Sequence, residues 1–359
     1  MKETIRRKLH PGRALAALTA LALVLCLLPA FSAAESAQTP QNWVDFLLIC
    51  NEGMNNDKGN AGNTLMVISM NPEEGKIRLL MFTWDTFVDY EGYDVPQKLD
   101  MPYRNNGPEE SMKVFNDNFG TNIEFFISLN YLNLADLINE YGGVNVDISR
   151  AERNARNGMV ASKKKQLLQK VDSGFLSQAL VDALAEDYYL NEFGPNTHLN
   201  GLQAVGFGWL QYDSVYNCCE RDAQVIGHFF ESCGTTIGKK IAFYTNEIPC
   251  PEDLSGRRAI NLDNMTDSDY VFIRKLIDPI FKKSFNNLTE DKIRGITLSL
   301  ARVAFDASRQ GVDIFDSVKT MVLPLEAKNE YDIIAGAKGH IVDKEANSAA
   351  IKEFLFSEN

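Results

Sequence analysis

The sequence of 359 residues has no low-complexity tract, no CxxC pair and, beyond residue 34, no apolar run long enough to cross a bilayer. It also has fewer basic than acidic residues, 36 against 48. The missing CxxC spacing argues against a zinc or dithiol redox site. The shortage of positive charge argues against a nucleic-acid partner, because such proteins neutralise phosphates with Lys and Arg. What remains is a globular chain, 45% hydrophobic, that can bury a large core.

The one long apolar run lies at the start of the chain. Five Lys or Arg side chains fall within residues 1–13, residues 14–28 are apolar, and Pro29 and small residues follow up to residue 34. This order is typical of an export signal. Because residues 14–34 carry no charge, a retained membrane anchor is the alternative. We therefore expect an extracytoplasmic protein, secreted or anchored at the outer face of the cytoplasmic membrane, with residues 43–359 forming one domain.

Five cysteines lie beyond residue 34, an odd number that cannot all pair within one chain. Cys50 lies in an apolar run and is expected to be a small buried residue. Cys218 and Cys219 are adjacent, without the spacing of a metal or redox motif. Without residues 1–34 the chain keeps 31 basic and 47 acidic residues, a net charge of −16.

Three short apolar runs, residues 44–50, 64–70 and 77–83, predict strands buried on both faces. The polar residues 71–75, which include Pro and Gly, predict a hairpin between the second and the third. Polar groups stand at the other strand ends, where a sheet presents loops to a ligand. These groups include Glu52, Asn63 and Asp85.

The rest of the chain alternates helical and strand patterns, which predicts a layered α/β domain. Residues 150–170 are strongly basic and suit either a solvated helical face or contact with anionic lipid headgroups. No stretch is long or Pro-rich enough to mark a domain boundary. The expected helices are residues 107–119, 132–140, 220–232, 267–285, 290–308 and 346–356, and the further strands are 124–129 and 144–148.

The order of motifs over residues 43–232 resembles the LytR-CpsA-Psr family. Its most specific pieces are Asn71-Pro72, Asp85-Thr86, residues 142–147 (GGVNVD), and Leu199-Asn-Gly201 followed by Gln203-Ala204. The resemblance implies a three-layer α/β/α fold with a mixed central sheet flanked by helices, in a protein of bacterial cell-envelope assembly. It also implies the family chemistry: a glycan phosphate moves from a polyprenyl-pyrophosphate carrier to peptidoglycan, with Mg²⁺, arginine clamps and a pocket for the lipid.

Against the family pattern the chain lacks most of the expected charges. Where the family has Gly-x-Asp, Glu52 keeps one carboxylate as the candidate metal ligand. Where the family has Arg-x-Asp-Thr, the chain has Ala61 and the neutral amide Asn63. Where it has Pro-Arg-Asp, the chain has Trp84 before Asp85. We therefore expect Mg²⁺ binding to be weak or absent.

The later positions continue this trend. Lys98 fits the lysine of the family, whereas Trp209 and Gln211 stand where an Arg-x-Arg pair is usual. Cys218 occupies the first position of Arg-x-x-Arg-Gln, and Arg221 keeps the second. The resemblance thus assigns Asp85, Lys98 and Arg221 to the catalytic set, and Asn63, Trp84, Trp209 and Gln211 to ligand binding.

Several of these residues also have a purely structural alternative, among them Glu52 as a solvated strand end. Asp85 with Thr86 is suited to capping a turn, Arg221 to pairing with Asp222 or Glu220, and the two tryptophans to filling the core. Two functions remain open. One is a degenerate family member that binds a polyprenyl-linked glycan, peptidoglycan or an envelope partner without efficient catalysis; the other is an active, Mg²⁺-dependent glycan phosphotransferase with a relocated set of charges.

Overall fold

The three apolar runs form the middle of one sheet in the computed structural model, which describes residues 43–52, 62–172, 177–245, 258–311, 313–325 and 329–356. β1 (Val44–Asn51), β2 (Gly62–Asn71) and β3 (Lys76–Phe82) pair antiparallel in chain order. The predicted hairpin joins β2 to β3, where Asn71 accepts hydrogen bonds from two backbone amides of the turn. Residues 1–34 and Cys250 lie outside the described residues.

Three further strands complete this sheet, in the order β11-β6-β1-β2-β3-β12. β6 (Phe126–Asn130) runs parallel to β1, and β12 (Val318–Leu323) runs parallel to β3. β11 (Phe285–Asn286) pairs antiparallel with β6 at the edge. The sheet is therefore mixed, as expected, although β12 falls where the sequence suggested only loops and helices.

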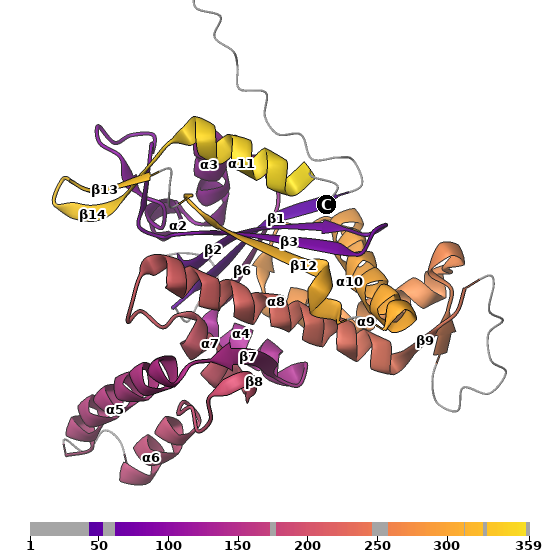
Figure 1. Cartoon of the computed structure of the whole chain (residues 1–359), viewed down its shortest axis with the longest axis horizontal. Coiled ribbons are helices and arrows are strands. Elements are labelled where there is room, and N and C mark those ends of the chain that lie inside the picture. Colours follow the sequence, from indigo (N-terminus) through magenta and orange to yellow (C-terminus); the bar gives the residue numbers. More distant parts are fainter. Residues whose placement is uncertain are drawn as a thin grey trace, which may run out of the picture. The chain divides into compact units, whose positions relative to one another are not determined.

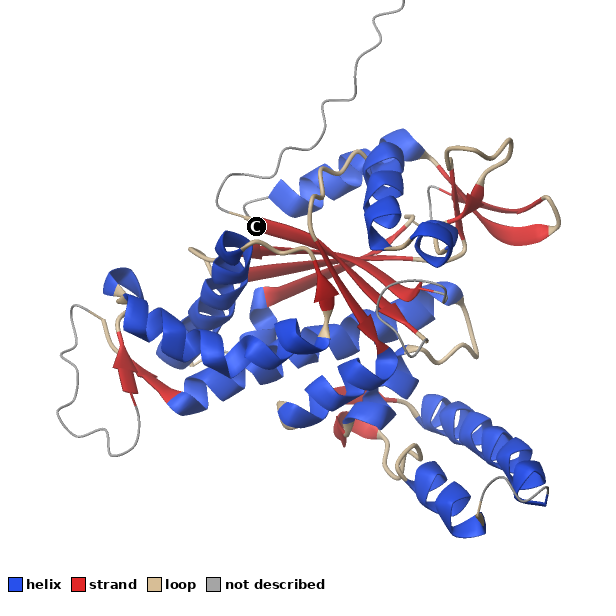
Figure 2. Ribbon diagram, turned by 180° about the vertical axis from the view of Figure 1, so that it is seen from behind, coloured by secondary structure: helices blue, strands red, loops and turns tan. Residues whose placement is uncertain are grey.

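Alternate side chains of each central strand enter two different cores. Phe46 and Leu48 join one hydrophobic cluster, and Leu47 and Ile49 join the other. Successive side chains of a strand point to opposite faces of the sheet, and both faces are buried here. The central strands are therefore apolar at nearly every position. Figures 1 and 2 show helices covering both faces of the sheet, so the three-layer α/β/α fold is confirmed.

The helices divide unequally between the two faces. One face packs against α4, α7, α8, α9 and α10, and the other against α2, α3 and α11 (Figure 1). The described residues all belong to one compact unit. None of the helices in the described part of the chain combines the length and apolarity needed to span a bilayer. The helix bounds are α2 Met101–Asn106, α3 Pro108–Phe119, α4 Tyr131–Glu140, α7 Gly201–Gly208, α8 Val215–Lys240, α9 Asp267–Lys283, α10 Glu290–Gln310 and α11 Lys344–Phe356, with short 3-10 turns η1 Leu262–Asn264 and η2 Ile314–Ser317.

Helix α8 is longer than the sequence pattern indicated. The helix expected to stop near Gly234 continues to Lys240. Its glycines serve packing instead: a Cβ at Gly227 would lie 2.7 Å from the Phe315 ring, and one at Gly234 would lie 3.3 Å from Ile314. The missing side chains make room for η2, which lies against α8.

Smaller sheets lie outside the central one. β7 (Val144–Ile148) pairs with β8 (Gly194–Leu199). β7 therefore does not join β6 in the central sheet, as a β-α-β unit would require. β9 (Ile241–Phe243) pairs with β10 (Arg258–Ile260). A four-stranded sheet has the order β13-β14-β4-β5, with bounds Asn329–Ile334, Ala337–Val342, Thr86–Val88 and Gln97–Lys98.

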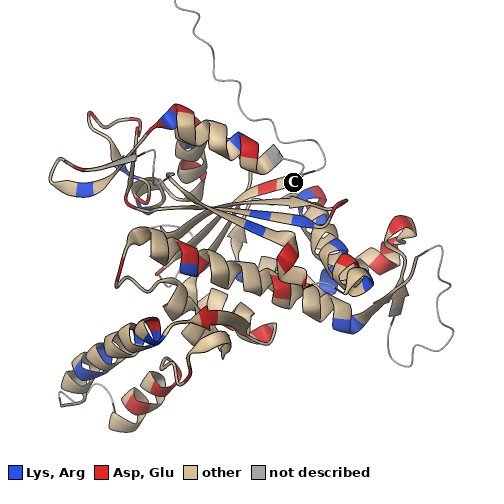
Figure 3. Cartoon of the chain, in the orientation of Figure 1, with Lys and Arg blue, Asp and Glu red and all other residues tan. Residues whose placement is uncertain are grey.

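The basic segment forms α5 (Arg150–Asp172), beside α6 (Gln178–Glu186). Figure 3 shows α5 carrying mostly basic and α6 mostly acidic side chains. Lys164 and Asp182 form an ion pair of 2.8 Å between the two helices. Arg156 lies over the ring of Tyr188. Two of the basic side chains of α5, Lys164 and Arg156, therefore make contacts within the protein.

Two of the family-like motifs have local structural roles. Asn200 and Gln203 form a reciprocal capping box at the start of α7. Gly201 packs so closely on α4 that a Cβ would lie 1.8 Å from the Ala135 carbonyl oxygen. Gly143 has φ of +83°, and a Cβ there would meet the His198 ring at 2.5 Å. These positions build the fold.

Candidate functional site

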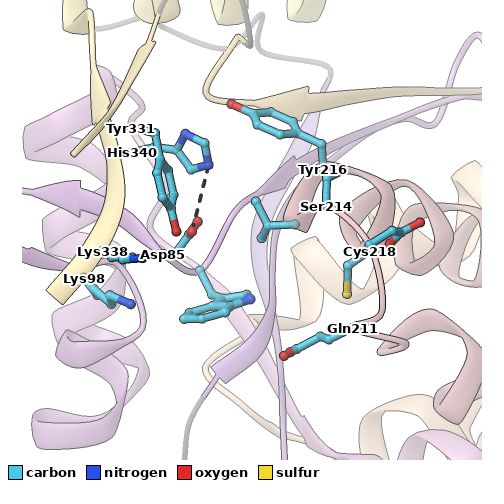
Figure 4. A pocket seen from close by; sticks show the side chains of 12 residues that line it. Asp85, Lys98, Gln211, Ser214, Tyr216, Cys218, Tyr331, Lys338 and His340 are labelled. Atoms are coloured by element: carbon cyan, nitrogen blue, oxygen red, sulfur yellow. Dashed lines mark ion pairs between the residues drawn. The ribbon is translucent and has the colours of Figure 1, made fainter. Parts of the chain in front are cut away.

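A cavity of about 670 Å³ opens where the end of β3, the start of α8 and the β13–β14 hairpin meet. Figure 4 shows labelled side chains from these elements around it. Of the residues singled out in the sequence, Trp84, Asp85, Lys98, Gln211 and Cys218 line this cavity. Glu52, Asn63, Trp209 and Arg221 do not.

Asp85 is held in a tight turn between β3 and β4. The turn is closed by Thr83 and Thr86, through a backbone bond of 3.2 Å and a hydroxyl contact of 2.7 Å, so the Asp85 carboxylate is not its cap. The carboxylate is buried, and Oδ2 lies 3.9 Å from Nε2 of His340. Among the described residues Oδ1 has no hydrogen-bond partner. A buried polar group without a partner costs about 1–3 kcal/mol, so this oxygen is suited to accepting a bond from a ligand.

Trp84 and Lys98 form an aromatic and cationic wall. Lys98 Nζ lies 4.8 Å from the centroid of the Trp84 ring, within the range of a cation–π contact. Trp84 Nε1 is buried and has no partner within the described part of the chain. Neither Lys98 nor Lys338, which also lines the cavity, forms an ion pair with a described residue. The wall therefore offers an unused indole donor and two lysines without an ion-pair partner.

Arg221 faces a different hollow. Its guanidinium donates to the Asp213 carboxylate at 2.7 and 3.0 Å and to Glu152 at 3.5 Å, and it also bonds the Leu210 carbonyl. The suggested partners Asp222 and Glu220 are not the ones it takes. The Arg221 hydrogen bond holds the pKa of Asp213 below its usual value. Because its charge is already matched, Arg221 has little left for a phosphate in the Asp85 cavity.

Trp209 takes part in a buried hydrogen-bond chain. Trp209 Nε1 donates to Thr64 Oγ1 at 3.0 Å, and Thr64 donates to Asp222 Oδ2 at 2.5 Å. Asp222 is wholly buried, and this burial raises its pKa to about 7. Asp222 was not expected from the sequence to be an interior acid. The available signal was its place beside Arg221 in a helix whose apolar residues recur on the same face.

The four cysteines in the described part of the chain are structural. Cys50, Cys218, Cys219 and Cys233 are free and buried. Cys218 contacts the Gly208 carbonyl through its sulfur at 3.6 Å, and burial raises the pKa of its thiol to about 12. A thiol with so high a pKa is a poor nucleophile near neutral pH.

Glu52 and Asn63 pair with each other. Asn63 Nδ2 donates to Glu52 Oε1 at 2.6 Å, so one carboxylate meets an amide where two carboxylates would suit a divalent cation. Within the residues that the structure describes, no three His, Cys, Asp or Glu side chains gather as a metal-binding group. This donor set does not fit the hard, multi-oxygen coordination that Mg²⁺ prefers, and weak Mg²⁺ binding stays a prediction.

Comparison with known proteins decides the family. The sequence model of the LytR_cpsA_psr family matches residues 32–224, more than half of the chain. The chain belongs to the LytR-CpsA-Psr family. One curated relative of this LytR-CpsA-Psr protein is the polyisoprenyl-teichoic acid–peptidoglycan teichoic acid transferase TagU of Bacillus anthracis. The two are 26% identical over 103 residues, which are 29% of this chain and 34% of TagU. The chain therefore spans about a third of the length of the curated relatives it matches.

Solved structures share the LytR-CpsA-Psr fold. The crystal structure of B. subtilis TagV aligns with a TM-score of 0.55 at 13% identity, covering 88% of this chain and 96% of TagV. A structure of TagT bound to LIIa-WTA gives 0.53 at 12% identity, covering 88% and 90%. At these identities the likeness concerns the fold alone.

The β13–β14 hairpin lies outside the segment that matches the LytR-CpsA-Psr family and was not expected from the sequence. It contributes Tyr331, Lys338 and His340 to the cavity. A signal was present in the short run Ala335-Gly336 between two β-prone segments, which suits a two-residue turn. Only the fold brings these residues to Asp85, some 250 positions earlier in the chain.

Proposed function

We propose that this protein acts in the cell envelope, where it binds a polyprenyl-linked glycan or peptidoglycan in the Asp85 cavity without efficient phosphoryl transfer. The names of its relatives support the ligand class, since TagU is a transferase between polyisoprenyl-teichoic acid and peptidoglycan and TagT was solved with LIIa-WTA. The observation that carries the proposal is the composition of the cavity. It offers an indole face, two unpaired lysines and an unpartnered carboxylate oxygen, while Arg221 is held elsewhere by Asp213 and Glu152.

The energetics favour binding over catalysis. Stabilising the charge of a transferring phosphoryl group requires several cations, and losing one transition-state donor lowers turnover by about 10²–10³-fold. In the family pattern Trp84, Trp209, Gln211 and Cys218 replace expected cations, and Asn63 replaces a carboxylate. Aromatic faces such as Trp84 still contribute to holding a ligand, because they stack on apolar faces and attract cations.

The protein is proposed to work outside the cytoplasm and to associate with the membrane through residues 1–34 or the basic helix α5. Its expected partners are a lipid-linked glycan or peptidoglycan, with no role for nucleic acid. Fractionation of cells that carry the full chain, followed by N-terminal sequencing, separates a cleaved signal from a retained anchor. Recovery of the intact chain from the cytosol would contradict the proposed location.

The test uses the secreted chain with a polyprenyl-pyrophosphate-linked glycan, first for binding and then for transfer to peptidoglycan fragments in the presence of Mg²⁺. We expect measurable binding and transfer at the background rate. Lys98→Gln should weaken binding, because it removes a charge from the cavity. Lys113→Gln is the matched control, since Lys113 carries the same charge but pairs with Glu91 on the surface. Absence of binding would contradict the proposal.

One observation favours a second candidate, an active Mg²⁺-dependent glycan phosphotransferase that attaches anionic polymers to peptidoglycan. Lys338 and His340 of β14 stand beside Asp85, so a cation and an imidazole have been supplied from outside the family segment. Metal-dependent transfer by the unmodified chain, lost in both Asp85→Ala and Lys338→Gln, would favour this candidate over binding alone.

A further inference from the structure

The β13–β14 hairpin is built to be rigid. Its strands pair in register from Asn329 opposite Val342 to Ile334 opposite Ala337, leaving a loop of only two residues. Ala335 and Gly336 have φ of 49° and 83°, the positive values that a type I′ turn requires. A two-residue turn of this type matches the twist of its strands, so it fixes which side chains share a face.

The hairpin is fastened to the turn that carries Asp85. β14 runs parallel to β4, and the His340 amide donates to the Asp85 carbonyl at 3.2 Å. A Cβ at Gly339 would lie 2.1 Å from the same carbonyl oxygen, so only glycine permits this approach. The hairpin and the Asp85 turn therefore hold one fixed geometry.

One face of the hairpin looks into the cavity. Tyr331 lies opposite His340 in the register, and Lys338 lies on the same face, two residues from His340. The His340 ring is flanked by the rings of Tyr331 and Tyr216, with centroids 4.9 and 5.2 Å away (Figure 4). Tyr331 nevertheless keeps 60% of its surface exposed. A large aromatic side chain held in place yet open to solvent is a suitable stacking surface for a ligand ring.

The charges around the cavity are unbalanced on the hairpin side. The two acids that line the cavity are Asp213, which pairs with Arg221 at 2.7 Å, and Asp85, whose Oδ2 lies 3.9 Å from the imidazole of His340. Lys98 and Lys338 have no ion-pair partner within the described ranges. An anionic group of the ligand would meet Lys338 without displacing an ion-pair partner.

We propose that the β13–β14 hairpin determines ligand specificity by holding an acidic sugar, with Tyr331 stacked on the sugar ring and Lys338 binding its phosphate or carboxylate. The inference rests on the proposed function and names the part of the glycan that the cavity selects. The hairpin lies outside residues 32–224, the segment that matches the family model, so these ligand contacts come from another part of the chain.

Ligand-observed NMR titration of the secreted chain with a hexose 1-phosphate, a hexuronic acid and the neutral hexose tests this assignment. We expect an acidic sugar to bind about three- to fivefold more tightly than the neutral one, as one partly exposed charge pair allows. Lys338→Gln should abolish this preference and Lys338→Arg should keep it. Tyr331→Ala should weaken all three sugars by about three- to tenfold without changing their ratio. Preference for the phosphate points to the glycan linkage, and preference for the carboxylate points to a uronic acid.

The hairpin supplies its own controls. Ile341 is 36% exposed, lies on the face of β14 opposite to His340 and does not line the cavity, so Ile341→Ala should bind like the unmodified chain. Lys344→Gln removes the same charge as Lys338→Gln at an exposed ion pair with Asp89 and should also have no effect. Equal binding of acidic and neutral sugars, no binding of any sugar, or no change in the Tyr331 and Lys338 variants would overturn the inference.

Failure of the proposed function gives a different pattern. If the lipid-linked glycan binds and the hairpin variants bind it as the unmodified chain does, only the specificity assignment is lost. If acidic sugars bind through Lys338 but the lipid-linked glycan does not, the site survives and the proposed ligand class is wrong.

Discussion

Replacing Asp222 by Asn is expected to stabilise the folded protein at pH 8 and to change its stability little at pH 4. The carboxyl of Asp222 is wholly buried, and burial raises its pKa from 3.8 to about 7, although the side chains of Thr64 and Trp209 pull in the opposite direction. Below about pH 3 the group is protonated in both the folded and the unfolded chain. As the pH rises from there to about 7, the unfolded chain releases the proton more readily, so the folded state loses stability.

The size of the effect follows from the two pKa values. Each pH unit between them corresponds to about 1.4 kcal/mol, so a change from 3.8 to about 7 amounts to roughly 4–5 kcal/mol at most. The amide of Asn has nearly the same shape, does not ionise, and keeps an oxygen that can accept the Thr64 hydroxyl. The advantage of Asp222→Asn over the unmodified chain should therefore grow from near zero at pH 4 to about 2–4 kcal/mol at pH 8.

Urea unfolding of both chains between pH 4 and 8 measures this difference directly. Asp213→Asn is the matched control with the opposite sign: its pKa is lowered by the Arg221 hydrogen bond, so it stabilises the fold at neutral pH and loses that contribution as the pH falls. Asp213→Asn should thus be destabilising at pH 7. An Asp222→Asn advantage that stays constant across the range would refute the assignment of a buried, titrating carboxyl.

Three further substitutions or reactions follow from the same contacts. Gly339→Val should lower the free energy of unfolding by about 1–3 kcal/mol and expose the hairpin to proteolysis, because its side chain would collide with the Asp85 carbonyl. Asn63→Asp should raise Mg²⁺ affinity in calorimetry, since it puts a second carboxylate beside Glu52, whereas Asn63→Gln should not. The Cys218 thiol should react with a disulfide reagent at pH 8 only after denaturant is added, because it is buried and its pKa is about 12.

The parts of the fold that could be predicted from the sequence are those set by local pattern. The three apolar runs became β1, β2 and β3, and Gly120 ends α3 in the left-handed conformation, as expected of a helix stop. Gly234 is also a glycine near an expected helix end, but it lies inside α8. The absence of a side chain there lets Ile314 pack close to the helix. β12 was missed since its partner β3 lies some 240 positions away, and no local pattern encodes that pairing.

The candidate site was recovered only in part for the same reason. Trp84, Asp85, Lys98, Gln211 and Cys218 meet in one cavity, but a sequence cannot show that Arg221 turns away from it. That orientation depends on where Asp213 and Glu152 come to lie. The contribution of Tyr331, Lys338 and His340 was equally hidden, because it depends on the close approach of Gly339 to the Asp85 turn.

Two departures from the family pattern, Trp209 and Asp222, belong to one hydrogen-bond network. Trp209 stands where the resemblance implies an arginine, and Asp222 where it implies a glutamine, and the structure links both through Thr64. A buried acid and a neutral indole donor are compatible there, since the raised pKa of Asp222 keeps it largely protonated below about pH 7, where no arginine has to balance its charge. Arg221, the neighbour of Asp222, is satisfied on the other side by Asp213. Restoring a single cation would therefore disturb a satisfied interior network, whereas the lysines around Asp85 are unpaired and open to a ligand.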